Sequence, residues 1–260
     1  MGEPSSIDES VVSRKRYEGV RNVIGFNWPM YSGAAVVYTL LLAAAAVVPS
    51  QVLKQYFVMA AGIPAYFAVV SLLVSYWVYD CSNLYKFDWF VKLLPSPPAR
   101  ILNLHAGFDE ASAYLKLRFP AAQLKVFDFY SPSTSTESSM ARARVANQAT
   151  STAPLSVGLN NWNLPDGSQD LVVIFLAAHE LRKGTDRDRF FAEVYRVLSS
   201  GGRCVLVEHQ RDLPNFLAYG IGFLHFLPHK EWLRTIGTAG FKLAQQTNIT
   251  PFIKVFCLCK

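Results

Sequence analysis

With 260 residues, the chain is long enough for one domain or two, and at 51% hydrophobic and 17% charged residues it is too apolar for an average cytosolic enzyme. The net charge of +6 suits an anionic membrane surface, but it is spread diffusely and does not indicate nucleic-acid binding. No charged residue lies between Arg21 and Lys54 or between Lys54 and Asp80, whereas charges recur every few residues beyond Asp80. We therefore expect two unlike parts, one apolar and one soluble.

Two apolar stretches, at 29–48 and 57–79, follow a polar N-terminal tail over residues 1–28. Each stretch is about 20 residues long, which as a helix covers about 30 Å, the thickness of the hydrocarbon core of a bilayer. Pro29 suits the first turn of the first helix, and Pro64 is expected to kink the second. The pattern predicts a transmembrane helical hairpin; the alternative is a pair of buried helices in a large soluble core.

The positions of lysine and arginine predict the orientation of this hairpin. Basic residues flank it on the side of the chain termini: Arg14, Lys15, Arg16, Arg21, Lys86, Lys92 and Arg100. Between the stretches there is a single lysine, Lys54. Because Lys and Arg favour the cytoplasmic side, both termini and the soluble domain are expected in the cytoplasm.

The segment 80–99 mixes aromatic with charged residues and ends in a proline-rich break, which predicts an interfacial helix and then a domain boundary. From residue 100 to 260, apolar runs alternate with helical stretches. Strands are expected at 101–104, 123–128, 170–175 and 203–208, and helices at 109–118, 137–147 and 185–198. Two more strands, at 242–247 and 252–259, are joined by a short turn. The predicted fold is α/β: a Rossmann-like, doubly wound, mostly parallel sheet with a terminal antiparallel hairpin.

In a doubly wound sheet, ligands bind beyond the carboxyl ends of the strands. The segment 101–110 reads as a strand, a turn with one glycine and the start of a helix. Asp128 ends the next strand about 20 residues later, where a carboxylate can accept hydrogen bonds from both hydroxyls of a ribose.

Over roughly residues 100–260, the chain resembles class I S-adenosylmethionine-dependent methyltransferases. The segments that carry the resemblance, in the order of that family, are ILNLHAGFDEAS, KVFDFY, LPDGSQDLVVIFLAAHEL and FFAEVYRVLSSGGRCVLVEH, followed by the closing hairpin. The resemblance implies S-adenosylmethionine as cofactor. The terminal hairpin and the lack of G-x-G-x-x-G disfavour an NAD-dependent oxidoreductase.

The first motif departs from the family pattern of an acid followed by G-x-G-x-G. Asn103 stands in place of the acid, His105 and Asp109 replace two glycines, and Gly107 is retained. These changes partly obstruct the approach of the backbone to a cofactor, although Asp109 is a good helix N-cap and supplies a carboxylate nearby. The residues that the resemblance implies for cofactor binding are Asn103, His105, Gly107, Asp109, Asp128, Asn161 and Trp162, with the last two beside the adenine ring.

Each of these residues also has a plainer interpretation. His105 could be a loop histidine with a backbone partner, and Asn161 and Trp162 could form a turn with a surface tryptophan. His179 and His209 follow the fourth and fifth strands, at the carboxyl edge where the acceptor should lie. Methyl transfer to oxygen or nitrogen needs positioning and a base, so His179 or His209 is the candidate catalytic base, with structural hydrogen bonding as the alternative.

A metal site is not predicted. His225 and His229 are four residues apart and, with Glu208 and His209, are residue types that bind metals. However, Pro228 breaks the helix that would align the two histidines. The chain has no HExxH motif, and its four cysteines show no CxxC pair.

The apolar, aromatic segment 212–228 is expected to form a lid or an interfacial patch, with core packing as the alternative. Together with the hairpin, it predicts a membrane-anchored methyltransferase whose partners are the lipid bilayer and a hydrophobic small-molecule or lipid acceptor. The altered glycine loop motivates an alternative function, a catalytically inactive methyltransferase-like module that binds or scaffolds at the membrane.

Overall fold

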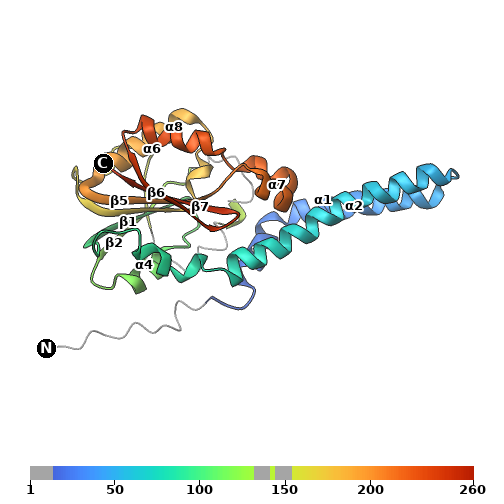
Figure 1. Ribbon diagram of the computed structural model, residues 1–260, viewed down its shortest axis with the longest axis horizontal. Coiled ribbons are helices and arrows are strands. Elements are labelled where there is room, and N and C mark those ends of the chain that lie inside the picture. The colour runs from blue at the N-terminus through green and yellow to red at the C-terminus, as the bar shows by residue number, and fades with distance from the viewer. Residues whose placement is uncertain (1–13, 132–140, 144–153) are drawn as a thin grey trace.

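The computed structural model describes residues 14–131, 141–143 and 154–260. Two long helices project side by side from an α/β domain that the rest of the chain builds (Figure 1). The N-terminal tail before residue 14 and most of the helix expected at 137–147 lie outside the described residues.

The projecting pair consists of α1, Glu18–Val47, and α2, Gln51–Tyr76. Three residues join them, and the hydroxyl of Ser50 accepts a hydrogen bond from the N–H of Leu53, which caps α2. Both helices are long and apolar enough to cross a membrane, and only 6% and 11% of their most apolar windows are buried. A pair of core helices in a soluble protein would be mostly buried, so the exposure of these side chains disfavours that alternative.

Helix α1 begins well before the predicted start at residue 29, so Pro29 lies inside the helix rather than in its first turn. Asn27 takes non-helical dihedral angles, φ −115° and ψ 16°. A proline removes one backbone N–H donor and its ring clashes with the carbonyl four residues earlier, which accounts for a kink at this point. The predicted start therefore marks a kink, whereas α2 continues through Pro64 to its end.

The segment expected to be an interfacial helix, 80–99, is a series of short turns. A π-helical turn at Trp77–Cys81 is followed by a 3₁₀ turn at Leu84–Lys86 and by α3, Asp88–Val91. Between the last two, Phe87 adopts a left-handed conformation with φ 54°, which prevents a continuous helix. The Phe87 ring is buried and stacks on that of Phe175 at 5.5 Å, so these aromatic residues pack under the sheet.

The domain contains a seven-stranded sheet of order β3-β2-β1-β4-β5-β7-β6. Neighbouring strands are parallel except β7, which is antiparallel to both β5 and β6. This confirms the predicted fold class. The strands are β1 Arg100–His105, β2 Gln123–Asp128, β3 Leu155–Ser156, β4 Gln169–Phe175, β5 Leu198–His209, β6 Lys242–Thr250 and β7 Ile253–Cys259. The two-residue strand β3 is too short to be predicted from its sequence.

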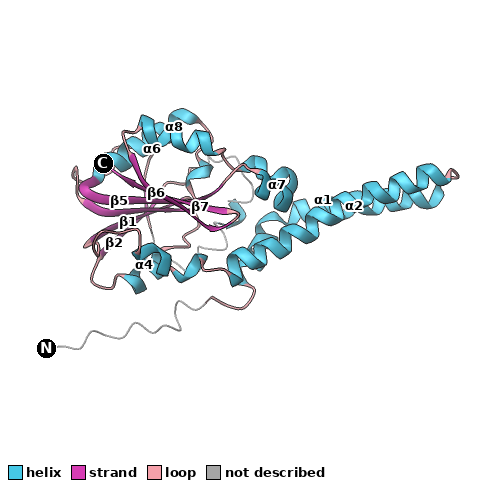
Figure 2. Ribbon diagram, in the orientation of Figure 1, coloured by secondary structure: helices cyan, strands magenta, loops and turns pink. Residues whose placement is uncertain are grey.

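Helices cover both faces of the sheet (Figure 2). On one face lie α6, Gly184–Val197, and α8, His229–Thr238, and on the other lie α4, Ser112–Arg118, and the turns after α2. Helix α6 buries Phe190, Phe191, Val194 and Val197, which recur at the three-to-four-residue spacing of one helical face. The segment after β5 forms α7, Leu213–Tyr219, and a 3₁₀ turn, Gly220–His225.

Candidate functional site

The carboxyl edge of the sheet lies against the base of the helix pair. His209, the last residue of β5, has its Nε2 atom 2.7 Å from the hydroxyl of Tyr79, just beyond α2. On the other side, the ring of Phe26 in α1 lies 5.2 Å from that of Phe108, in the loop after β1. The edge where ligands bind in folds of this type therefore faces the two apolar helices.

The loop after β1 is held by the carboxylate at the end of β2. Oδ1 of Asp128 accepts hydrogen bonds from the backbone N–H groups of Gly107, at 2.8 Å, and Tyr130, at 2.9 Å. Gly107 has φ +85°, a conformation that glycine adopts more easily than other residues. The backbone conformation therefore explains why a glycine is retained at this position. The Nδ1 atom of His105 lies 3.8 Å from the same oxygen, and both side chains are buried. The structure thus brings together three of the residues expected at the cofactor site.

Two of the three substituted motif residues, Asn103 and Asp109, are bonded to each other. The buried amide Nδ2 of Asn103 donates to Oδ1 of Asp109, at 2.9 Å, and to Oγ of Ser112, at 2.8 Å. The same Asp109 oxygen accepts the backbone N–H groups of Ala111 and Ser112. The N-cap of α4 is Ala111 and not Asp109, so the predicted N-cap is wrong, although Asp109 holds the turn before the helix. Oδ1 of Asn103 is buried and has no hydrogen-bond partner among the described residues.

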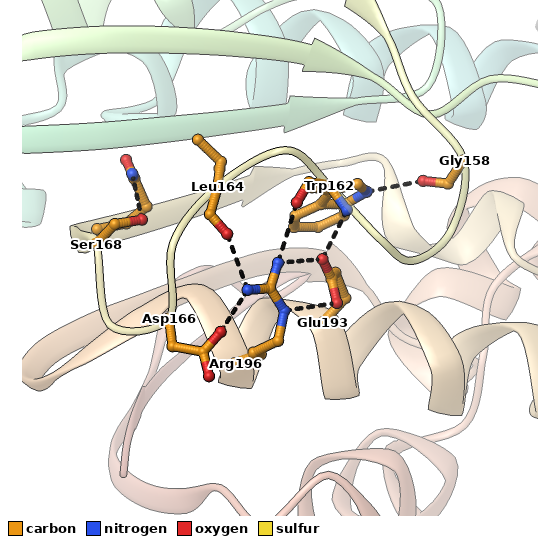
Figure 3. A network of polar contacts seen from close by, with 8 residues as sticks. Gly158, Trp162, Leu164, Asp166, Ser168, Glu193 and Arg196 are labelled. Carbon is orange, nitrogen blue, oxygen red and sulfur yellow. Dashed lines mark hydrogen bonds and ion pairs between the residues drawn. The ribbon is translucent and has the colours of Figure 1, made fainter.

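Trp162 is a buried side chain, so the alternative of a surface tryptophan is wrong. Its backbone N–H donates to Oε1 of Glu193 and its indole N–H donates to the carbonyl of Gly158, both at 2.8 Å (Figure 3). Its ring packs edge-on against that of Phe190, on α6. Asn161, beside it, is exposed and has φ 58°. Contact of these two residues with an adenine ring stays a prediction.

Arg196, near the end of α6, fixes the loop that leads into β4 (Figure 3). Its guanidinium makes five hydrogen bonds: Nε and Nη2 to the carboxylate of Glu193, Nη2 also to the carbonyl of Trp162, and Nη1 to the carbonyl of Leu164 and to Oδ1 of Asp166. An arginine has five N–H donors, so all of them are used. The three-residue spacing of Glu193 and Arg196 is the sequence signal that would have revealed part of this network.

His179, one of the two predicted bases, is oriented by Glu208, the penultimate residue of β5. Its Nδ1 lies 2.7 Å from Oε2 of Glu208, and its backbone N–H donates to Oε1 at 3.2 Å. Because a carboxylate accepts, Nδ1 carries the proton and Nε2 presents its lone pair. That Nε2 lies 3.5 Å from Oε1 of Glu180, and the same oxygen lies 3.3 Å from Nε2 of His225. Two histidines and a carboxylate thus converge.

His209, the other predicted base, has partners for both ring nitrogens. The amide Nδ2 of Asn215 donates to Oδ1 of Asp212 and to the carbonyl of Phe252, so the Asn215 oxygen faces Nδ1 of His209, at 3.0 Å. Nδ1 of His209 therefore carries the proton, and Nε2 accepts from the hydroxyl of Tyr79. Burial lowers the pKa of His209 to about 3, which keeps the ring neutral. This geometry joins β5 to the base of the helix pair.

The histidine pair considered from sequence, His225 and His229, does not converge. The His229 ring stacks on Phe256 at 5.6 Å, whereas the His225 ring lies 4.8 Å from that of His179. Sequence spacing did not indicate the latter pair, because the residues lie on segments that only the folded chain brings together.

The segment that follows β5 carries an exposed apolar patch. Its most exposed apolar residues are Leu213, Leu217, Ile221 and Leu224, with Ile221 78% accessible. Beside it, an apolar groove is lined by Tyr66, Val70 and Val74 of α2 and by Leu213, Pro214, Leu217, Ala218 and Phe252. The exposure of these side chains matches the predicted lid or interfacial patch better than core packing.

Residues 110–206 match the protein family described as "Methyltransferase domain". Residues 110–206 thus form a methyltransferase domain. This agrees with the sheet order, and S-adenosylmethionine is the cofactor that this class of domain indicates. The match begins directly after the altered glycine loop.

The methyltransferase domain has a curated relative, the demethylmenaquinone methyltransferase of Thermus thermophilus. The two chains are 32% identical over 115 residues, which cover 44% of this chain and 49% of the relative. The chain thus spans about half the length of the curated relative it matches.

The fold is shared with a solved methyltransferase. The mitomycin 7-O-methyltransferase MmcR superposes with a TM-score of 0.52 at 12% identity, covering 98% of this chain and 76% of MmcR. A SAM-dependent methyltransferase from Aquifex aeolicus gives a TM-score of 0.49 at 16% identity, over 70% of this chain and 94% of its own. At these identities the likeness is one of fold alone.

Proposed function

We propose that the protein is a membrane-anchored, S-adenosylmethionine-dependent methyltransferase that acts on a lipid-soluble or membrane-bound acceptor. The observation that carries this proposal is the bond between Tyr79, at the base of the helix pair, and His209, at the carboxyl edge of the sheet. It places the edge expected to bind substrates beside the helices expected to enter a bilayer. An acceptor that leaves the hydrocarbon region would meet the site directly.

The membrane part of the proposal rests on α1 and α2, whose exposed apolar side chains extend away from the domain (Figure 1). The proposed organisation is a tail over residues 1–28, a hairpin over 29–79, a linker over 80–99 and the catalytic domain over 100–260. Because the basic residues flank the hairpin on the side of the termini, the domain is placed in the cytoplasm. A reporter fused after Lys260 should score cytoplasmic, and an external signal would overturn this orientation.

The residues of the first motif fit S-adenosylmethionine. Gly107 permits close backbone approach, and the buried Oδ1 of Asn103 is an acceptor to which an amino group could donate. The carboxylate of Asp128, at the end of β2, would accept a hydrogen bond from a ribose hydroxyl. Asp109 would compensate for the lost glycine by holding the turn before α4 through its bonds to the N–H groups of Ala111 and Ser112. The bound cofactor would supply the methyl group, while these residues would hold and orient it. Cofactor roles for His105, Asn161 and Trp162 belong to the same proposal.

We propose His179 as the catalytic base. Glu208 fixes its ring with Nδ1 protonated, so Nε2 can accept the proton of an oxygen or nitrogen acceptor during in-line displacement. His209 is the weaker candidate, because its Nε2 already accepts the hydrogen bond of Tyr79. Its better-supported role is to position the helix pair on the domain.

The acceptor is proposed to be a ring with a hydrophobic tail, such as a quinone. The relative from Thermus thermophilus is by name a methyltransferase of demethylmenaquinone, a lipid-soluble quinone. In this chain, the groove between α2 and α7 has an almost wholly apolar lining that suits an isoprenoid or acyl tail.

Calorimetric titration of the full-length protein in detergent with S-adenosylmethionine tests the cofactor site. The wild type should bind, and Asp128→Ala should lose at least about tenfold in affinity, the effect of one charged hydrogen bond. Asp128→Asn keeps an oxygen that can accept from the N–H of Gly107 but removes the charge that would bind the ribose. A loss of affinity in this variant would therefore reflect ribose binding and not a disturbed loop. Asp166→Asn, at the opposite edge of the sheet, is the matched control. Absence of binding at millimolar cofactor would overturn the enzyme assignment.

The alternative, a catalytically inactive module, is favoured by the side chains that replace the two glycines of the loop. Transfer of a radiolabelled methyl group to lipids extracted from the membrane separates the two functions. Labelled lipid that disappears in His179→Gln supports the enzyme. Cofactor binding without labelled product, tested on membranes that carry quinones, supports the binding module.

A further inference from the structure

We propose that His179, Glu180 and His225 form a binding site for a divalent transition-metal ion of the zinc type. One ligand atom from each residue lies within 4.8 Å of the other two. Two histidines and one carboxylate are a donor set found in catalytic zinc sites, which keep a further position open. The binding of the ion does not depend on methyl transfer.

Two of the three distances between ligand atoms in the cluster suit ligands around one ion, and the third, between the two histidines, is within 4.8 Å. Oε1 of Glu180 lies 3.5 Å from Nε2 of His179 and 3.3 Å from Nε2 of His225. Hydrogen bonds between such atoms are about 2.7–3.2 Å long. With metal–ligand bonds of about 2.0–2.1 Å, two ligand atoms of a tetrahedral site lie about 3.3–3.4 Å apart.

Glu208 supplies the outer support that metal-binding histidines have in proteins. Its carboxylate accepts a hydrogen bond from Nδ1 of His179 at 2.7 Å. The lone pair of Nε2 therefore points toward the cluster and can bind the ion. Glu208 is fully buried and Glu180 is 4% exposed. Two buried carboxylates thus lie within one cluster, a setting that a dication would stabilise.

The segment that carries His225 is held in place by two arginines. Arg182 donates to the backbone carbonyls of His225 and Leu224, and Arg211 donates to those of Leu224 and Phe226. His179 and Glu180 lie in a 3₁₀ turn, Ala178–Glu180, directly after β4. The ligands thus come from two fixed turns. The side chain of His225 remains 23% exposed, so an ion can reach the site.

The position of the cluster suggests that the ion would help to bind the acceptor. His225 ends the turn that carries the exposed apolar patch, at the carboxyl edge of the sheet. An ion there would occupy the lone pair of Nε2 of His179, so in the metal-bound protein the ion, rather than His179, would activate an acceptor oxygen bound at its open position and orient it toward the cofactor. This role, unlike the binding itself, rests on the proposed function.

Metal binding can be measured on the full-length protein in detergent, after treatment with a chelator and dialysis against Co²⁺. Bound Co²⁺ is quantified by mass spectrometry, and its visible absorption reports tetrahedral coordination by nitrogen and oxygen. The expected result is one ion per chain. His225→Gln and Glu180→Gln should each weaken binding at least about 100-fold, and Glu208→Gln at least about tenfold. His229→Gln, a nearby histidine outside the cluster, should bind as the wild type does.

Two outcomes would overturn the proposal: no Co²⁺ bound by the wild type, or binding that His225→Gln and Glu180→Gln leave unchanged, which would be adventitious surface binding. Melting curves of the ion-free variants identify any that fail to fold. Calorimetry with S-adenosylmethionine is a separate readout, so loss of the metal site and failure of the methyltransferase function can be told apart.

Discussion

The two edges of the sheet carry polar networks of opposite character. At the amino edge, the guanidinium of Arg196 donates all five of its hydrogens to acceptors at 2.5 to 3.1 Å. At the carboxyl edge, Glu180 faces His179 and His225 at 3.5 and 3.3 Å, beyond the usual range of hydrogen bonds. The first network consists of hydrogen bonds within the protein, whereas the second contains two distances that suit ligand atoms around an ion.

This contrast follows from the cost of burying charge. A buried ionised group is stable only when its hydrogen-bonding capacity is met, as it is around Arg196. A buried carboxylate that faces two histidines can instead be stabilised by a bound cation. We therefore expect the Arg196 network to stabilise the fold and the cluster of His179, Glu180 and His225 to bind a ligand. The following changes test that distinction.

The largest effect is expected from Arg196→Ala. This change leaves the buried carboxylate of Glu193 and the carbonyls of Trp162 and Leu164 without their donor, so unfolding should become easier by about 2 to 3 kcal/mol. The measurement is the urea midpoint of the protein in detergent. Arg189→Ala, an exposed arginine on the same helix, should change it by less than about 0.5 kcal/mol. Equal effects of the two variants would refute a structural role for the network.

The next effect is a loss of stability in acid that depends on His209. Its pKa is about 3 in the folded protein and about 6.5 when unfolded, so below pH 6.5 the unfolded chain binds a proton that the folded chain does not. Stability should fall by about 2 kcal/mol between pH 7 and pH 5 from this residue. The quantity to measure is the difference between wild type and His209→Gln at the two pH values. A difference that does not change with pH would contradict the buried, neutral histidine.

Much of the fold could be predicted from sequence because its signals are local. Continuous apolar runs such as 170–175 predict buried parallel strands, and β4 has nearly those bounds. The linker was predicted less well, since the left-handed residue Phe87 breaks a segment whose composition suited one helix. At the site, the retained Gly107 and Asp128 were recognisable by position. The convergence of His225 with His179 was not, because the two lie 46 positions apart in the chain and only packing brings them together.

A smaller effect is expected where the first motif differs from its family. Asn103→Asp restores the usual acid, but it removes two N–H donations and places a carboxylate against Oδ1 of Asp109. Stability should fall by about 1 to 2 kcal/mol. Adding Asp109→Asn should recover most of the loss, because the asparagine oxygen can still accept from the N–H groups of Ala111 and Ser112 and its amide can donate to the introduced carboxylate. Thermal melts of the two single variants and the double variant measure this coupling. Additive effects would show that the two substitutions arose independently of each other.

The smallest effect is expected at the carboxyl-edge cluster, from His225→Gln without metal. The side chain is partly exposed and its contact with Glu180 is longer than a hydrogen bond, so stability should change by less than about 0.5 kcal/mol. With zinc at about 100 times its dissociation constant, the wild type should gain about 2.7 kcal/mol and the variant almost nothing. Melting temperatures with zinc and with a chelator measure both values. A large loss in the chelated variant would instead make the cluster a structural network like that of Arg196, and the contrast between the two edges would fail.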